Sequence, residues 1–174
     1  MSAELTAPLA VTPRHELEQV AFDQAMEARI ADLLGRYPTK KAALLPLLWL
    51  CQDRWGWISP GVMRAVADRL ELAPAEVEGV VTFYTMYRPQ PPGKYVLQVC
   101  STLSCQLCGA AALIQHLKRK LGIEFGQTSA DGRFTLVDVQ CLGACGEGPV
   151  VQMNDDYHTR LTVEELDRLL DGLR

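Results

Sequence analysis

Four of the six cysteines in this chain lie in two short groups, Cys100 with Cys105 and Cys141 with Cys145. Each group directly follows a run that looks like a β-strand, residues 95–99 before the first and residues 134–140 before the second. Clustered cysteines in a reducing compartment are more often metal ligands or redox catalysts than disulfides. If the two strand ends lie side by side, the four sulfurs meet at one point, so the spacing predicts a metal site.

Three chemistries fit these cysteines. A [2Fe–2S] cluster takes two thiolates per iron, and the glycines at 143, 146 and 148 favour it, because they let the chain bend around a bulky cofactor and let N–H groups reach its sulfurs. Structural zinc usually uses C-x₂₋₄-C pairs, and both spacings lie within or next to that range. Dithiol chemistry is the third, because Cys105 and Cys108 form a C-x-x-C motif before a helix, whose N-terminus stabilises a thiolate.

An ambiguity remains inside the cluster interpretation. Cys100, Cys105 and Cys108 also match the plant-type ferredoxin spacing, which needs one distant fourth cysteine and leaves either Cys141 or Cys145 unused. We favour two ligands from each group, because a tight C-x₃-C among glycines at a strand end is otherwise hard to explain. Cys108 is then expected to be a small buried side chain at the start of a helix.

The remaining cysteine and the histidines point to no site of their own. Cys51 lies among leucines and a tryptophan in a helical pattern and is expected in the core. His15, His116 and His158 are scattered singly, outside the cysteine groups, so a Rieske-type site with two histidines is not expected. Isolated histidines of this kind usually lie at the surface.

Composition limits the class of protein. A chain of 174 residues that is 48% hydrophobic can bury one good core or two small ones. The net charge of −4 provides no basic stripe for nucleic acid. A strongly apolar, uncharged stretch at residues 42–52 has 11 residues, whereas a membrane span needs about 20. No secretory signal is evident, so the protein is expected to be soluble and intracellular.

Apolar residues at spacings of three and four predict four helices in the first half. The first runs from about 16 to 37, and the second from 39 to 55 with a kink at Pro46. Ser59 is the expected N-cap of the third, and Pro74 opens the fourth. The apolar stripe of the fourth helix is Val77, Val80, Val81, Tyr84 and Tyr87. With no phosphate loop or catalytic pair, this half is expected to be a packing module whose surplus aromatics could also serve a partner interface.

The second half follows a proline-rich linker at 88–93 and has the order β-α-β, then β-β-α. The expected elements are a strand at 95–99, a helix carrying Leu107, Ala110, Ile114, Leu117 and Leu121, a strand at 134–140, a hairpin of 150–153 with 157–161, and a last helix capped by Thr162 and Glu165. A β-α-β crossover makes its two strands parallel, so Cys100 and Cys141 should leave the same edge of the sheet. The order is that of a thioredoxin-like sheet with helices on its faces.

The sequence therefore predicts an α+β protein with two domains. Residues 1–14 form a loose lead-in, residues 15–90 a helical bundle, and residues 91–174 a thioredoxin-like α/β domain that carries the two cysteine groups. Pro149 stands just before the third strand, where thioredoxin-like folds often keep a proline.

Several segments together resemble a known family. The chain resembles the E-type subunit of respiratory NADH:quinone oxidoreductase (complex I), a thioredoxin-like [2Fe–2S] ferredoxin. The matching segments are residues 42–46, 52–59, 81–87, 93–100, 139–149 and 154–157. The resemblance implies that Cys100, Cys105, Cys141 and Cys145 hold the cluster and that Cys108 does not.

The resemblance also implies a function and partners. The cluster would exchange single electrons with the FMN of a partner subunit that binds NADH, with an adjacent iron–sulfur subunit close by. The chain has no dinucleotide-binding fingerprint and no catalytic residues of its own, so it would be an enzyme only as part of the complex. That complex would form a peripheral arm on the cytoplasmic face of the inner membrane, without membrane insertion or nucleic acid. The alternatives are the same module in an NAD-linked formate dehydrogenase or hydrogenase, a thiol–disulfide oxidoreductase, or a zinc-stapled interaction module.

Overall fold

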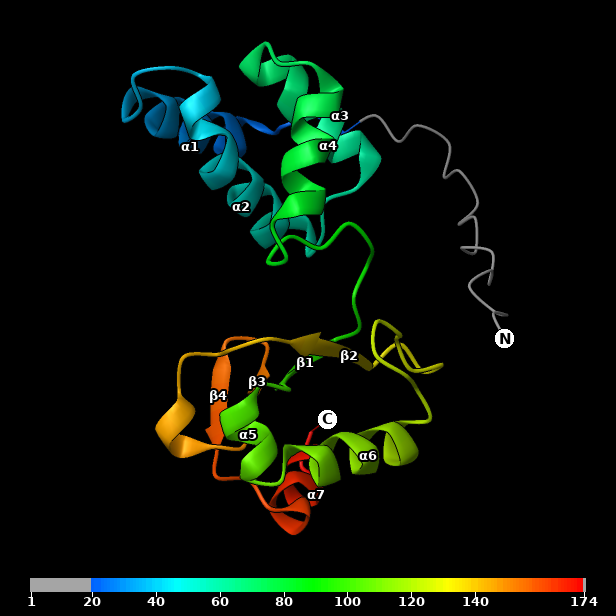
Figure 1. Cartoon of the computed structure of the whole chain (residues 1–174). Coiled ribbons are helices and arrows are strands. Elements are labelled where there is room, and N and C mark those ends of the chain that lie inside the picture. The colour runs from blue at the N-terminus through cyan, green and yellow to red at the C-terminus, as the bar shows by residue number, and fades with distance from the viewer. Residues whose placement is uncertain (1–19, 174) are drawn as a thin grey trace, which may run out of the picture. The chain divides into compact units, whose positions relative to one another are not determined.

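The computed structural model describes residues 20–173 and divides them into two compact units, with the boundary between Pro91 and Pro92 (Figure 1). The predicted lead-in at 1–14 and the predicted helix start at 16 lie outside the described residues. Each unit has a hydrophobic core of its own.

The first unit is helical. It comprises α1 (Gln24–Gly35), a 3₁₀ turn (Lys41–Ala43), α2 (Leu44–Trp55), α3 (Pro60–Leu70) and α4 (Pro74–Phe83). The residues that the helical periodicity marks as apolar form one core, in which Ile30, Leu47 and Val66 are fully buried. Cys51 is fully buried in the same core, as predicted, and this burial raises the pKa of its thiol to about 12.

Two helix boundaries differ from the prediction. The first helix begins only after Asp23, whose carboxylate accepts a hydrogen bond from the Met26 amide at 2.8 Å and caps α1. The kink predicted at Pro46 is wrong, because α2 begins at Leu44 and Pro46 lies in its first turn. Amides in the first turn of a helix have no acceptor within the helix, so a proline there breaks nothing. The residues before Leu44 form the 3₁₀ turn instead.

Hydrogen bonds hold the segment after α4 to α2. The stripe predicted for the fourth helix is too long, since α4 ends at Phe83 and Tyr87 lies beyond it. Tyr87 is nonetheless buried, and its hydroxyl donates to the Leu45 carbonyl at 2.8 Å. The buried side-chain amide of Gln52 makes two hydrogen bonds. Its Nε2 donates to the Met86 carbonyl at 3.0 Å, and its Oε1 accepts from the backbone N–H of Arg88 at 2.7 Å. These bonds fix the chain as it leaves the helical unit.

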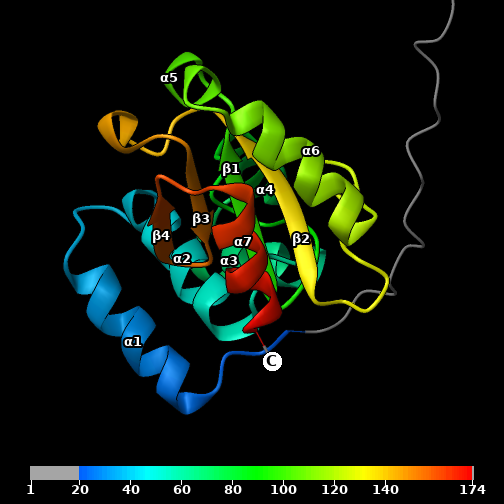
Figure 2. The ribbon, with the colours of Figure 1, turned by 90° about the horizontal axis from the view of Figure 1, so that it is seen from below.

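The second unit is a sheet with helices. It comprises β1 (Tyr95–Cys100), α5 (Leu103–Leu107), α6 (Ala110–Leu121), β2 (Phe134–Val139), a 3₁₀ turn (Cys145–Glu147), β3 (Val150–Met153), β4 (Asp156–Thr159) and α7 (Val163–Asp171). The strand order is β2-β1-β3-β4; β1 and β2 are parallel, as predicted, and the other neighbours are antiparallel. Helices α6 and α7 pack into one core against the sheet, lined by Leu97, Leu136 and Val151 (Figure 2).

The helix predicted after the first cysteine group is divided in two. The break is at Gly109, whose φ of 95° lies in the left-handed region that favours glycine. Leu107 therefore belongs to α5 and is 80% exposed, so the buried stripe begins at Ala110 instead. The predicted capping box of the last helix is confirmed, because Thr162 and Glu165 each accept the backbone amide of the other. Among the described helices, none is long and apolar enough to cross a membrane.

Candidate iron–sulfur site

The parallel pairing of β1 and β2 brings the two cysteine groups to one edge of the sheet. Cys100 is the last residue of β1 and is in register with Val139, the last residue of β2. The Ser101 amide then donates to the Val139 carbonyl at 3.1 Å, so the two strands stay together as they end. Cys141 follows two residues after β2 and therefore begins its loop beside Cys100.

The first cysteine group is buried. Cys100 is 2% and Cys105 is 1% exposed, and the short helix α5 positions Cys105. The Cys100 Sγ lies 3.1 Å from the Thr102 hydroxyl oxygen and 3.2 Å from the Gln140 carbonyl oxygen. Because Gln140 belongs to the second loop, the latter contact joins the two groups.

The second group is exposed, and its two sulfurs lie together. The Sγ atoms of Cys141 and Cys145 are 3.6 Å apart, and the Gly143 amide donates to the Cys141 Sγ at 3.4 Å. Gly143 has a φ of 80°, which lets the loop fold back so that its amide reaches the sulfur. The predicted role of this glycine beside a cluster stays a prediction, and the contact with Cys141 is consistent with it.

Apolar contacts close the second loop over the first. Leu142 and Ala144 pack against a small buried cluster that contains Cys100 and Cys105. Gly148 lies against the start of the α5–α6 connection, and a Cβ placed there would be 3.3 Å from the Cβ of Cys108. The structure thus gathers all four predicted ligand cysteines in one small region, as two thiol pairs.

The pKa values of the thiols reflect this crowding. Burial, reinforced by a hydrogen bond with Cys100, raises the pKa of Cys105 to about 11. Burial acts in the same direction on Cys100, but hydrogen bonds from the Thr102 side chain and amide outweigh it and lower the pKa of that thiol. A hydrogen bond with Cys141 raises the pKa of Cys145, and the charge of Cys100 adds to the shift. Cys105 and Cys145 therefore ionise less readily than an ordinary cysteine, and a bound cation would favour their thiolate forms.

The donor set fits an iron–sulfur cluster. Within residues 20–173, no group of three or more His, Cys, Asp or Glu side chains is arranged to hold a single metal ion. The thiols are instead arranged as two pairs, and a [2Fe–2S] cluster takes two thiolates on each iron. The Thr102 hydroxyl lies beside the Cys100 sulfur, and the Gly143 amide lies beside the Cys141 sulfur. Hydrogen-bond donors of this kind commonly surround the ligand sulfurs of iron–sulfur clusters.

Cys108 differs from the prediction. It is exposed rather than buried, because α5 ends at Leu107 and Cys108 is its C-cap instead of the start of a long helix. Of the histidines, His116 is half-buried and bonds to the Asp167 carboxylate at 2.7 Å, and His158 lies on β4. His15 lies outside the described residues.

Two residues near the thiols escaped the sequence reasoning. The hydroxyl of Thr102 contacts the Cys100 sulfur, and the hydroxyl of Tyr157 donates to the Leu142 carbonyl at 2.9 Å. The spacing of Thr102 two residues after Cys100 could have indicated the contact between the Thr102 hydroxyl and the Cys100 sulfur. The second contact joins residues 15 positions apart across different elements, and no local pattern indicates it.

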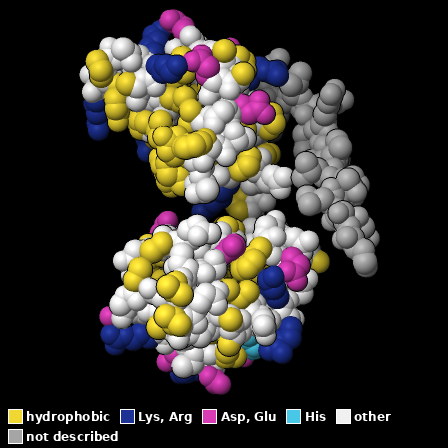
Figure 3. All heavy atoms as spheres, in the orientation of Figure 1, with side chains coloured by type: hydrophobic (Ala, Val, Ile, Leu, Met, Phe, Trp, Pro, Cys, Tyr) yellow, Lys and Arg dark blue, Asp and Glu magenta, His cyan; other side chains and the backbone are white. Residues whose placement is uncertain are grey.

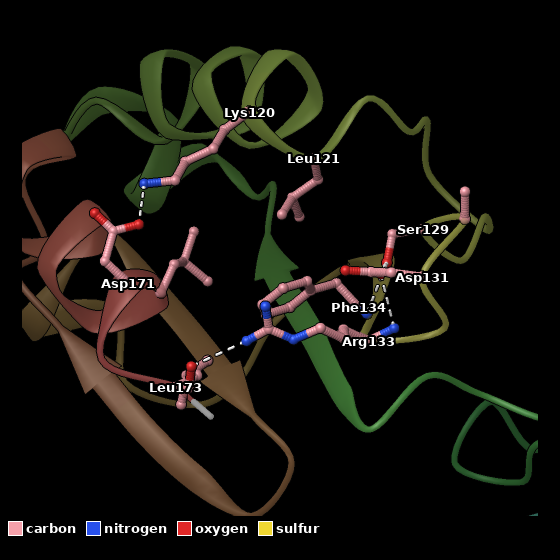
Figure 4. Close-up of a pocket in the computed structure, with 10 residues that line it drawn as sticks. Lys120, Leu121, Ser129, Asp131, Arg133, Phe134, Asp171 and Leu173 are labelled. Carbon is pink, nitrogen blue, oxygen red and sulfur yellow. Dashed lines mark hydrogen bonds and ion pairs between the residues drawn. The ribbon is translucent and has the colours of Figure 1, made fainter.

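A hollow of about 550 Å³ lies between α6, α7 and the start of β2 (Figure 4). Its charged groups are already paired: Lys120 bonds to Asp167 and Asp171, and the Arg133 guanidinium donates to the Leu173 carbonyl. Because β2 begins here and ends at the cysteines, the hollow is at the opposite end of the strand from the thiols.

The fold and the paired thiols define a small thioredoxin-like protein with a thiolate site at the ends of its parallel strands. The chain belongs to the thioredoxin-like [2Fe–2S] ferredoxin family, whose model matches residues 30–174. The predicted family, fold class and [2Fe–2S] cofactor are confirmed.

Relatives in this family are named as parts of one complex. The chain is 42% identical over 149 residues to the second E-type subunit of NADH-quinone oxidoreductase from Rhizobium meliloti, covering 86% of this chain and 89% of that protein. It is 38% identical over 162 residues to the E-type subunit from Rickettsia bellii, covering 91% of this chain and 97% of that protein. Among solved structures, an NAD⁺-reducing [NiFe]-hydrogenase in the H₂-reduced state matches 74% of this chain with a TM-score of 0.67 and 24% identity. This chain spans about a fifth (21%) of that hydrogenase chain, and the likeness is one of fold.

Proposed function

We propose that this chain is the electron-transfer subunit of an NADH:quinone oxidoreductase and carries one [2Fe–2S] cluster. The observation that carries the proposal is the β1–β2 register, which sets two thiol pairs side by side in a chain about 40% identical to subunits of NADH-quinone oxidoreductases. The chain takes part in an oxidoreductase reaction as a subunit and supplies no catalytic residue of its own.

Cys100, Cys105, Cys141 and Cys145 are the proposed ligands, two for each iron. The bound cluster supplies one-electron transfer. The residues around it hold the thiolates, and two donors face the sulfurs: the Thr102 hydroxyl at Cys100 and the Gly143 amide at Cys141. Burial of the first pair excludes water from one side of the site, and all of these factors set the reduction potential.

The electron partner is a separate subunit. Because the sequence has no dinucleotide fingerprint, we assign NADH and FMN to a flavin-binding subunit that exchanges single electrons with this cluster. An adjacent iron–sulfur subunit is the second proposed neighbour. We assign the assembly to a peripheral arm on the cytoplasmic face of the inner membrane, with this chain outside the bilayer.

The thiol–disulfide alternative is weaker. Its C-x-x-C motif would need a reactive thiolate, but Cys105 is buried and its pKa is raised to about 11. The fold likeness to an NAD⁺-reducing hydrogenase keeps a second NAD-linked assembly as the alternative host of the same module.

Purification of the complex from its native host tests the assignment. We expect an affinity-tagged form of this chain to co-purify with a flavin-containing NADH dehydrogenase that has quinone reductase activity. Recovery with a formate dehydrogenase or hydrogenase would move the chain to that assembly, and recovery of a protein with disulfide reductase activity and no iron would overturn the proposal.

A further inference from the structure

One peptide group of the second cysteine loop makes hydrogen bonds at both of its ends. This group joins Leu142 to Gly143. The Gly143 N–H donates to the Cys141 Sγ at 3.4 Å, and the Leu142 carbonyl accepts from the Tyr157 hydroxyl at 2.9 Å. Because a trans peptide group is planar, its C=O and N–H point in opposite directions, and fixing one direction fixes the other. The tyrosine hydroxyl therefore acts on the same group that faces the sulfur.

Glycine alone does not hold this peptide in its orientation. Gly143 has a φ of 80°, but glycine adopts negative φ values about as readily as positive ones. In a tight turn, the peptide before such a glycine can rotate by about 180°, as in the change between type II and type I turns. That rotation would point the Gly143 N–H away from Cys141. The hydrogen bond from Tyr157 to the Leu142 carbonyl favours the orientation in which the N–H meets the sulfur.

The sheet positions Tyr157 beside the cysteine loop. Tyr157 on β4 is in register with Gln152 on β3, and Gln152 is in register with Gln98 on β1. Because successive side chains of a strand alternate between the two faces, Tyr157 lies on the same face of the sheet as Cys100, which is two residues after Gln98. The Leu142 side chain packs against the buried cluster that contains Cys100. The loop is thus held at the Leu142 side chain and at the Leu142 carbonyl.

The segments around the thiols carry no charged side chains. Residues 95–115 and 139–146 contain no Asp, Glu, Lys or Arg. At the end of the loop, Glu147 and Arg160 neutralise each other in an ion pair of 2.7 Å. Figure 3 shows hydrophobic and uncharged side chains over most of one face of the second unit, with most of the charged side chains toward its edges. In such surroundings, hydrogen bonds to the ligand sulfurs are the main local influence on the reduction potential.

We propose, building on the function proposed above, that Tyr157 is a positioning residue for electron transfer. Its hydroxyl holds and polarises the peptide between Leu142 and Gly143, so that the Gly143 N–H stabilises the Cys141 thiolate. Hydrogen bonds in a chain polarise one another, and a donor at the carbonyl therefore strengthens the N–H···S bond. A stronger donor at a ligand sulfur favours the more negative, reduced state. Tyr157 thereby raises the reduction potential through the peptide group.

The test is a redox titration, followed by EPR, of the cluster-loaded full-length chain. Tyr157→Phe removes only the hydroxyl, and the ratio of reduced to oxidised cluster at a fixed potential should fall about threefold, which equals about 30 mV at about 59 mV per tenfold. The shift is modest because Tyr157 is 50% exposed, and water can partly replace its hydroxyl. Tyr95→Phe is the matched control. It removes a hydroxyl at the start of β1, at the opposite end of that strand from Cys100, and should leave the potential unchanged.

A second substitution separates donor strength from shape. Replacement of Tyr157 by 3-fluorotyrosine keeps the ring and the hydroxyl but makes the hydroxyl a stronger donor. Near neutral pH, where this hydroxyl stays protonated, the potential should rise above that of the unaltered chain, whereas a side chain that supports the loop by shape alone would give no rise. Deuterium exchange of the same cluster-loaded chains, followed by peptide mass spectrometry, is an independent readout. The Gly143 amide should exchange about threefold faster in Tyr157→Phe, because its hydrogen bond is weaker.

The outcomes separate this inference from the function beneath it. If the unaltered chain, purified without oxygen, holds no [2Fe–2S] cluster, the proposed function fails. If the cluster is present but Tyr157→Phe and the fluorinated chain have the potential of the unaltered chain, the function stands and the inference is overturned. An equal shift in Tyr95→Phe would also overturn it. If Tyr157→Phe does not retain the cluster, the fluorinated chain decides, since it keeps the hydroxyl and its potential either rises or does not.

Discussion

Cys100 and Val139 face each other at the last position of the parallel β1–β2 ladder. This relationship decides which residues meet beyond the strands, because both loops then leave the sheet at the same point. A slip of one residue in this register would turn every side chain of β2 to the opposite face. The buried Leu136, in register with Leu97 inside the core, prevents the slip and so fixes the position of the thiols.

The ligand assignment predicts opposite effects for two cysteine variants. Cys145→Ala should lose or strongly destabilise the cluster, because one iron would keep only one protein thiolate. Cys108→Ala should keep the cluster, because that thiol is a C-cap outside the two pairs. Iron and acid-labile sulfide analysis of the two variants, purified without oxygen, makes the comparison. Loss in Cys108→Ala with retention in Cys145→Ala would favour the plant-type assignment.

Thr102 is expected to tune the reduction potential. Its hydroxyl lies 3.1 Å from the Cys100 sulfur, and a donor to a ligand sulfur stabilises the more negative, reduced cluster. Thr102→Val keeps the shape but removes the donor, so the potential should fall by about 40 mV, equivalent to about 1 kcal/mol for one electron. Thr102→Ser should stay near the original value. A redox titration followed by EPR measures both, and equal potentials for valine and threonine would exclude this role.

The cysteines should differ sharply in reactivity. At pH 8 the cluster-loaded protein should be alkylated at the exposed Cys108, whereas Cys51 should stay unlabelled, because burial raises its pKa to about 12 and almost no thiolate forms. Removal of iron with a chelator should add labelling at the exposed Cys141 and Cys145. Peptide mass spectrometry maps the sites. Labelling of Cys51 in the folded protein, or none at Cys108, would be inconsistent with the structure.

Two glycines should respond in opposite ways to replacement by alanine. A Cβ at Gly93 would lie 2.9 Å from backbone atoms of Arg133 and Phe134, which cannot move without disturbing the start of β2. Gly93→Ala should therefore destabilise the protein by about 1–3 kcal/mol. Gly79→Ala meets open space inside α4 and should stabilise its unit by about 0.5–1 kcal/mol. Urea unfolding followed by circular dichroism compares them, and a harmless Gly93→Ala would show that the close approach is absent.

Short-range signals in the sequence predicted much of this protein. The cap at Ser59, the capping box of Thr162 and Glu165, and the parallel arrangement of the two strands follow from local chemistry and from the rules of chain crossover, and the structure has all three. The errors arose where tertiary packing decides the outcome. A glycine such as Gly109 is compatible with either a continuous helix or a break between two helices. In the structure the helix breaks there, and Leu107 and Cys108 are exposed as a result. The contact of the Tyr157 hydroxyl with Leu142 depends on the folded sheet and has no local signature.

The centre of the proposed function is a set of two neighbouring thiol pairs that would hold two irons. The most direct test is iron and acid-labile sulfide analysis of the anaerobically purified chain, combined with EPR of the reduced protein. We predict about two irons and two sulfides per chain and a spin-½ signal with g values near 2 on one-electron reduction. A colourless protein that contains zinc, or no metal, after the same preparation would contradict the two-iron site.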